Sequence, residues 1–187
     1  MRREPTMRWS RLKQMVESRI ATSLRGRIEL HSARYRHAHD SHGRVWLTVD
    51  GREVVSVSYH RTAAIRYHIA RGLREANAHV VASDPAFRAE FQDGWAPATA
   101  ITRKQGIVTQ FEFYDDLEEY LSQTVEQALE SPNPLIRALA IVDRRLGKRR
   151  LRSLSPDALD HPLIRELYDL RCVAEGIEHD ATSIRTP

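Results

Sequence analysis

Residues 45–57 decide the fold and read Val45-Trp46-Leu47-Thr48-Val49-Asp50-Gly51-Arg52-Glu53-Val54-Val55-Ser56-Val57. Two runs of β-branched and aromatic residues flank Asp50-Gly51, a dipeptide typical of the type I′ turn because both of its positions need positive φ. The pattern predicts a β-hairpin. An uninterrupted two-residue turn pairs Val49 with Arg52. It also places Leu47 opposite Val54 and Trp46 opposite Val55.

A further strand precedes this hairpin. From Arg27 onward the pattern has a period of two, with Ile28 and Leu30 alternating with charged residues. We therefore expect a three-stranded antiparallel meander. Residues 106–114 are rich in β-forming side chains and predict a probable fourth strand.

The first half of the chain also contains helical patterns. An apolar stripe at Trp9, Leu12, Val16 and Ile20 predicts an opening helix that ends near Gly26. A second stripe predicts a helix after Thr62. Residues 83–103 contain prolines and a glycine among mixed residues, which indicates irregular chain with at most one helical turn.

The C-terminal half is predicted to be mainly helical. We expect the acidic residues within 115–119 to form the first turn of a helix, where they complement the helix dipole. Asn133 and Pro134 have the pattern of an N-cap followed by a first helical residue, and that helix is expected to run to Gly147. A last helix is expected from Pro162 to Gly176.

These patterns together predict an α+β fold in which a small antiparallel sheet packs with helices. A length of 187 residues suits one domain, which we place at residues 7–176. Residues 1–6 are then an N-terminal extension and residues 177–187 a flexible tail.

Composition limits the cellular setting. Cys172 is the single cysteine, so no disulfide can form within the chain. No apolar run approaches the roughly 18 residues that a membrane span requires, and the first fifteen residues lack a signal-peptide core. We therefore expect a cytoplasmic protein with no membrane partner.

The formal charge of +4 is unevenly distributed. Residues 1–94 carry a net +7 and residues 95–187 a net −3. Oppositely charged halves can attract each other, so the overall charge does not by itself indicate a nucleic-acid partner.

Histidines and an aspartate gather in residues 37–42 and form the best candidate for a metal site. Imidazole and carboxylate groups suit zinc or a similar divalent ion, and His37 and His39 project from the same side of an extended chain. The alternative is a polar hairpin loop with solvated histidines. The candidate ligands are His37, His39, Asp40 and His42.

A basic cluster near the end of the predicted 134–147 helix could contact nucleic acid or another polyanion. Positive charge at a helix C-terminus also favours the helix, so a structural explanation covers part of the cluster. Its members are Arg144, Arg145, Lys148, Arg149, Arg150 and Arg152.

Four separated segments carry a family resemblance. They contain Trp9-Ser10-Arg11-Leu12-Lys13, Arg34-Tyr35-Arg36-His37-Ala38-His39-Asp40, Trp46-Leu47-Thr48-Val49-Asp50-Gly51, and Asp143-Arg144-Arg145-Leu146-Gly147-Lys148-Arg149-Arg150. Together they resemble an uncharacterised family of small bacterial cytoplasmic proteins, over roughly residues 9–176. The resemblance implies no activity, cofactor or partner, and so it supplies no site residue.

The sequence lacks a glycine-rich phosphate loop and a serine nucleophile elbow, the usual signatures of nucleotide hydrolysis and α/β-hydrolase chemistry. Our first hypothesis is a non-enzymatic intracellular binding or regulatory protein. A metal-dependent, hydrolase-like enzyme built on residues 37–42 is the alternative. A nucleic-acid or polyanion binder that uses residues 144–152 is the second alternative.

Overall fold

The computed structural model describes residues 7–34, 43–76, 94–154 and 159–177, and every structural statement below concerns these residues. Strands β1 (Ile28–Arg34), β2 (Gly43–Val49) and β3 (Arg52–Ser58) form one antiparallel sheet in the order β1-β2-β3. The helices are α1 (Trp9–Arg19), η1 (Thr22–Leu24), α2 (Tyr59–Ala76), α5 (Trp95–Lys104), α6 (Gln110–Ser122), α7 (Val125–Leu129), α8 (Pro134–Val142), α9 (Lys148–Arg152) and α10 (Pro162–Glu175).

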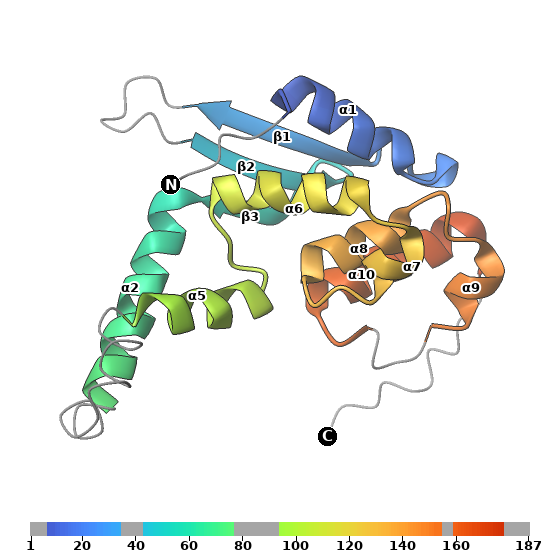
Figure 1. Ribbon diagram of the computed structural model, residues 1–187. Helices are drawn as coiled ribbons and strands as arrows, with labels where there is room; N and C mark the ends of the chain where they lie inside the picture. Colours follow the sequence, from blue (N-terminus) through green and yellow to red (C-terminus); the bar gives the residue numbers. More distant parts are fainter. Residues whose placement is uncertain (1–6, 35–42, 77–93, 155–158, 178–187) are drawn as a thin grey trace.

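The elements form an α+β arrangement, as predicted. Figure 1 shows α6 running across the sheet, α2 and α5 side by side at one end, and α7–α10 grouped at the other. The sheet and α1 thus share a core with the C-terminal helices, while the α2–α5 pair extends beyond it.

The predicted hairpin is present, but its register changes after the turn. Asp50 and Gly51 have φ of 49° and 78°, and Val49 pairs with Arg52 as expected. A β-bulge then places Leu47 opposite Val55 and Trp46 opposite Ser56, so the predicted pairs Leu47–Val54 and Trp46–Val55 are wrong. The bulge inserts Val54 as an extra residue, which turns Val55 and Val57 toward the core in place of Val54 and Ser56.

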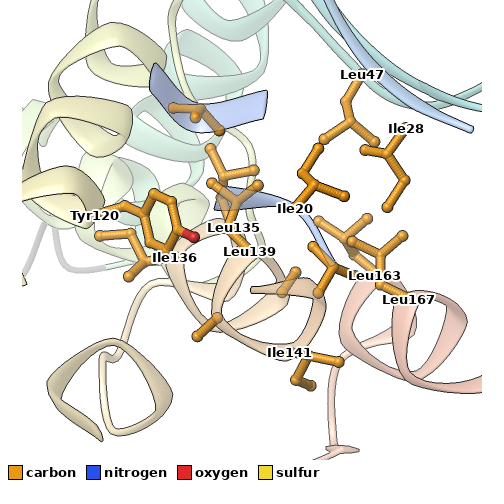
Figure 2. Close-up of a cluster of buried hydrophobic side chains, with 14 of the residues drawn as sticks. Ile20, Ile28, Leu47, Tyr120, Leu135, Ile136, Leu139, Ile141, Leu163 and Leu167 are labelled. Atoms are coloured by element: carbon orange, nitrogen blue, oxygen red, sulfur yellow. The ribbon is translucent and has the colours of Figure 1, made fainter. Parts of the chain in front are cut away.

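The main core lies between the sheet and the C-terminal helices. Leu47 and Ile28 of the sheet point toward Leu163 and Leu167 of α10, with Ile20 between them (Figure 2). All five side chains are at most 8% exposed. Burial of this apolar surface is the main stabilising contribution to the fold.

The opening helix ends earlier than predicted. α1 stops at Arg19 rather than near Gly26, because Ile20 forms a β-bridge with Asp143. The Ala21 N–H donates to the carbonyl of Val142, and the Arg144 N–H donates to that of Arg19. The backbone after α1 is therefore hydrogen-bonded to residues 142–144, far along the chain, and cannot continue the helix.

The predicted fourth strand is wrong, because α6 begins at Gln110 within residues 106–114. Thr109 accepts from the N–H of Glu112 while the Glu112 carboxylate accepts from the N–H of Thr109, a reciprocal capping box. This cap outweighs the local β propensity. The acidic residues 115–119 consequently lie inside α6 and not in its first turn.

The helix predicted for residues 134–147 is divided. α8 starts at Pro134 with Asn133 as its N-cap, as expected, but it ends at Val142. The Arg171 guanidinium donates to the carbonyls of Ile141, Asp143 and Leu146. Carbonyls beyond α8 are thus satisfied by a buried side chain, and residues 148–152 form a separate helix.

The α2–α5 pair differs from prediction in two respects. α2 begins at Tyr59 rather than after Thr62, and α5 is a full helix where irregular chain was expected up to residue 103. Residues 83–93 lie outside the described residues. Close approach of the two helices requires Gly94, because a Cβ there would lie 2.8 Å from the carbonyl oxygen of Ala70. Arg66 is only 3% exposed and belongs to the buried face of α2.

The last helix agrees with the sequence. α10 runs from Pro162 to Glu175 and ends at Gly176, which has φ of 63°. Ile177, assigned above to a flexible tail, is buried, and its N–H donates to the backbone carbonyl of Cys172. Residues 178–187 lie outside the described residues.

Candidate binding cleft

A cleft of about 300 Å³ lies along β3 and is called the β3 cleft below. Its walls are β3, the start of α2, the segment 105–108, and the N-terminal ends of α8 and α10. Most of the lining is aliphatic. These side chains include Val54, Val55 and Val57 on the strand and Ile107, Leu135 and Leu163 on the other walls.

Three polar lining residues hold the walls in place. Thr62 donates its hydroxyl hydrogen to the carbonyl of Val108 at 2.7 Å. Asn133 caps α8 by accepting from the N–H of Leu135 at 3.0 Å. His161 caps α10 in the same way, as described next.

The capping bond assigns the tautomer of His161. Its Nδ1 accepts from the N–H of Leu163 at 3.2 Å, so the ring hydrogen is on Nε2. Nε2 then donates to the carbonyl of Gln105 at 3.4 Å. His161 thereby connects α10 to the segment 105–108 across the cleft.

Arg61 is the one charged side chain of the lining that the structure leaves without a partner. Within the described ranges, no hydrogen bond or ion pair reaches its guanidinium group, and no carboxylate lines the cleft. At the other end of β3, Arg52 forms an ion pair with Glu166 of α10. Strand β3 therefore has an ion pair at its start, outside the lining of the cleft, and a positive charge without a partner after its end.

A buried ionic network stands behind the cleft and joins α2, α5 and α6. Arg66 donates to Thr102 Oγ1 at 2.9 Å and to Glu112 Oε2 at 2.9 Å. Burial alone would raise the pKa of Glu112, but its bonds from the Thr109 N–H and from Arg66 outweigh burial and lower it. Glu112 is thus held ionised opposite Arg66.

Asp116 continues this network toward α8. It is 1% exposed and accepts from Arg103 at 2.6 Å. Burial raises its pKa despite the opposing effects of Asn133 and Arg103. Because Asn133 also lines the cleft, a buried carboxyl group lies just behind one wall.

The predicted metal ligands His37, His39, Asp40 and His42 lie outside the described residues. His31 and Asp50, two potential ligands in and beside the neighbouring strands, are both engaged elsewhere. His31 Nε2 lies 3.0 Å from Thr48 Oγ1, and Asp50 accepts from Arg27 with both oxygens. Asp50 also follows the C-terminal end of β2, about 23 Å from Gly43 at the other end of that strand at strand spacing.

Among the described residues, no group of three or more His, Cys, Asp or Glu side chains could hold a metal ion. The site at residues 37–42 therefore stays a prediction from the sequence.

The six residues of the basic cluster divide into two groups. Arg145 pairs with Asp143, Arg150 pairs with Glu126, and Lys148 donates to the carbonyl of Glu175. The side chains of Arg144, Arg149 and Arg152 are exposed and have no such partner in the part of the chain that the structure describes. Half of the cluster therefore holds the fold together.

Sequence reasoning missed the β3 cleft. Pro162 marked the start of α10, and with it the capping position of His161, but nothing local indicated that His161 faces β3. Arg61 carried no signal beyond its charge. The cleft arises only where segments distant in sequence meet.

Comparison with known proteins adds a family assignment. The chain belongs to the SF0329 protein family, whose model matches residues 8–172. This range agrees with the extent of the resemblance found in the sequence. No curated protein and no solved structure matches the chain. No helix in the described ranges is both long and apolar enough to cross a membrane.

Proposed function

We propose that this chain is a non-enzymatic intracellular binding protein whose ligand occupies the β3 cleft. The observation that carries the proposal is the combination of aliphatic walls with one unpaired guanidinium group, on Arg61. Binding sites of this kind bury an apolar body and orient it through a few polar groups. The ligand expected is elongated, mainly apolar and acidic at one end.

The hydrogen bonds that the polar lining residues already make favour binding over catalysis. Thr62, Asn133 and His161 each use a polar atom to hold a wall, which leaves their side chains poorly placed to exchange protons with a ligand. Cys172 is fully buried, and burial raises the pKa of its thiol, which disfavours the reactive thiolate.

The test is isothermal titration of the protein with decanoate, an elongated apolar molecule with one carboxylate. Decyltrimethylammonium, with the same chain and the opposite charge, is the matched ligand control. We expect saturable decanoate binding that Arg61→Gln weakens by about fivefold, the size of an exposed ion pair. Arg74→Gln removes an equal charge from an exposed site on α2 and should leave the affinity unchanged.

The opposite results would overturn the proposal. They are the absence of saturable binding of decanoate, or binding that is equally strong for decyltrimethylammonium and insensitive to Arg61→Gln.

A polyanion-binding function is the second candidate. Three exposed arginines without partners, Arg144, Arg149 and Arg152, support it. Such side chains contact phosphate or sulfate groups through charge without reading sequence. Retention on a heparin column tests this candidate, as described in the Discussion.

A further inference from the structure

We infer that the ligand of the β3 cleft is an extended peptide segment, which pairs with the free edge of β3 and places its C-terminal carboxylate at Arg61. This inference rests on the proposed function and specifies the class of ligand. Four observations support it: the free strand edge, the path of the cleft, the position of Arg61 and the contrast with β1.

The two edges of the sheet differ. At β1, the Leu30 N–H donates to Glu17 at 2.9 Å, and the Leu30 carbonyl accepts from Lys13 at 2.8 Å. Side chains of α1 thereby cover the middle of that edge. Within the described ranges, β3 pairs only with β2, and no hydrogen bond reaches the outward backbone groups of residues 53–56.

Strand alternation identifies an outward-facing residue of β3. The backbone N–H and C=O of Leu30 point away from β2. Those of the next residue, His31, therefore point toward β2 and bond to Trp46 opposite it. Trp46 directs its backbone groups toward β1, and Ser56, opposite Trp46, therefore directs its N–H and C=O away from the sheet. An unpaired edge of this kind is a template for another strand.

The cleft follows this edge. Four consecutive residues, 54–57, line it, although their side chains alternate between the two faces of the sheet. A cavity on one face would be lined by alternate residues only. A length of four strand residues is about 13 Å, enough for a short extended segment.

The two ends of β3 set the direction of that segment. Arg52 is paired with Glu166 at the beginning of β3, whereas Arg61 follows the end of β3 without a partner. A carboxylate at Arg61 gives a peptide that runs parallel to β3. Segment 105–108 and α10 flank the edge, which favours one extended strand over the sheet of a second copy.

Fluorescence anisotropy with a fluorescein-labelled peptide of sequence Gly-Ser-Val-Thr-Val-Val tests the inference. The free-acid peptide should bind saturably, and its C-terminal amide about fivefold more weakly. Arg61→Gln should weaken binding of the acid by a similar factor and that of the amide little, because both changes remove the same ion pair.

Ser56→Pro tests the backbone pairing directly. Proline removes the outward N–H without breaking a bond to β2, and edge strands tolerate it. We expect about fivefold weaker peptide binding, the effect of one lost hydrogen bond. Ser56→Ala keeps the N–H and should bind as the unaltered protein does. Decanoate affinity should be equal in both variants and shows that Ser56→Pro has kept the cleft.

The outcomes separate the two proposals. Decanoate binding without peptide binding, or peptide binding insensitive to Ser56→Pro, overturns the inference and leaves the proposed function standing. Failure of both ligands to bind overturns both proposals. Concentration-dependent dimerisation that Ser56→Pro abolishes, with no peptide binding, would replace the peptide by a second copy of this chain.

Discussion

The hydroxyl group of Tyr120 donates a hydrogen bond to Asp143 Oδ2 at 2.6 Å in the interior of the protein. The two residues are 1% and 0% exposed. Burial and the neighbouring carboxylate both raise the pKa of Tyr120, so the phenol remains protonated and acts as the donor. This bond joins α6 to the point where the chain after α1 pairs with the end of α8.

Tyr120→Phe should lower the free energy of unfolding by about 1.5–3 kcal/mol, the usual contribution of a hydrogen bond to a charged group. Chemical denaturation measures this difference. Tyr67→Phe is the control, because Tyr67 is 53% exposed and its change should stay within about 0.5 kcal/mol. Equal stability of the two variants would show that the Tyr120–Asp143 bond contributes nothing net.

Asp143 should govern part of the loss of stability in acid. Burial alone would raise its pKa, but hydrogen bonds from Arg145 and Tyr120 outweigh burial and lower it. Ionised Asp143 therefore stabilises the fold above its unfolded pKa of about 4, and this contribution is lost as the pH falls through the lower folded pKa.

Asp143→Asn consequently has two expected effects. The variant should be less stable at pH 7 by about 1–3 kcal/mol, and it should lose less stability than the unaltered protein between about pH 5 and pH 2. Denaturation curves over this pH range measure both. Parallel curves for the two proteins would contradict the assignment.

Arg66 should attach α5 to the rest of the protein. It is 3% exposed and bonds to Thr102 of α5 and Glu112 of α6. Arg66→Met leaves the Glu112 carboxylate without this partner, which costs about 3–5 kcal/mol for a buried pair. We expect hydrogen exchange to accelerate first in residues 95–104, with α8 and α10 less affected.

Arg74→Met is the matched control for Arg66→Met, because it removes an exposed arginine of the same helix. It should leave exchange in α5 unchanged. Uniform acceleration throughout the chain in Arg66→Met would show that α5 does not open as a separate unit.

The basic cluster should separate into binding and structural residues. Arg149→Ala with Arg152→Ala removes two exposed side chains without partners, and should reduce retention on heparin with unchanged stability. Arg145→Ala removes the partner of buried Asp143 and should instead lower the free energy of unfolding by about 1–3 kcal/mol. Unchanged heparin retention in the double variant would rule out the polyanion function at α9.

The metal hypothesis for residues 37–42 makes its own prediction. One zinc or similar ion per chain should appear in native mass spectrometry after exposure to the metal, and should be absent from His37→Ala/His39→Ala. His68→Ala provides a control outside the segment. The same metal content in all three proteins would contradict a site at residues 37–42.

Local signals determined several elements correctly. Asp50-Gly51 set the hairpin turn, because the residues that tolerate positive φ are few. Asn133-Pro134 and Pro162 set the starts of α8 and α10 through capping, which involves only neighbouring residues. The Thr109-x-x-Glu112 capping box is local too, and it starts α6 although the surrounding residues favour β structure.

Other features could not be predicted because distant parts of the chain decide them. The bulge at Val54 places valines toward a core that α8 and α10 complete. Arg66 carries no local signal of burial, and its bonds to the distant residues Thr102 and Glu112 make that burial favourable. α8 ends early because the guanidinium group of Arg171, far along the chain, donates to the carbonyls of Asp143 and Leu146, which follow the helix.

The sequence by itself thus determined the α+β class, the hairpin turn and the starts of α8 and α10, because backbone conformation at caps and turns depends on adjacent residues. Only the tertiary structure decided the strand register, the burial of Arg66 and the β3 cleft. Burial of apolar surface and pairing of buried charge act between segments that are distant in the sequence and meet only in the folded chain. A short stretch of sequence does not indicate which segments will meet.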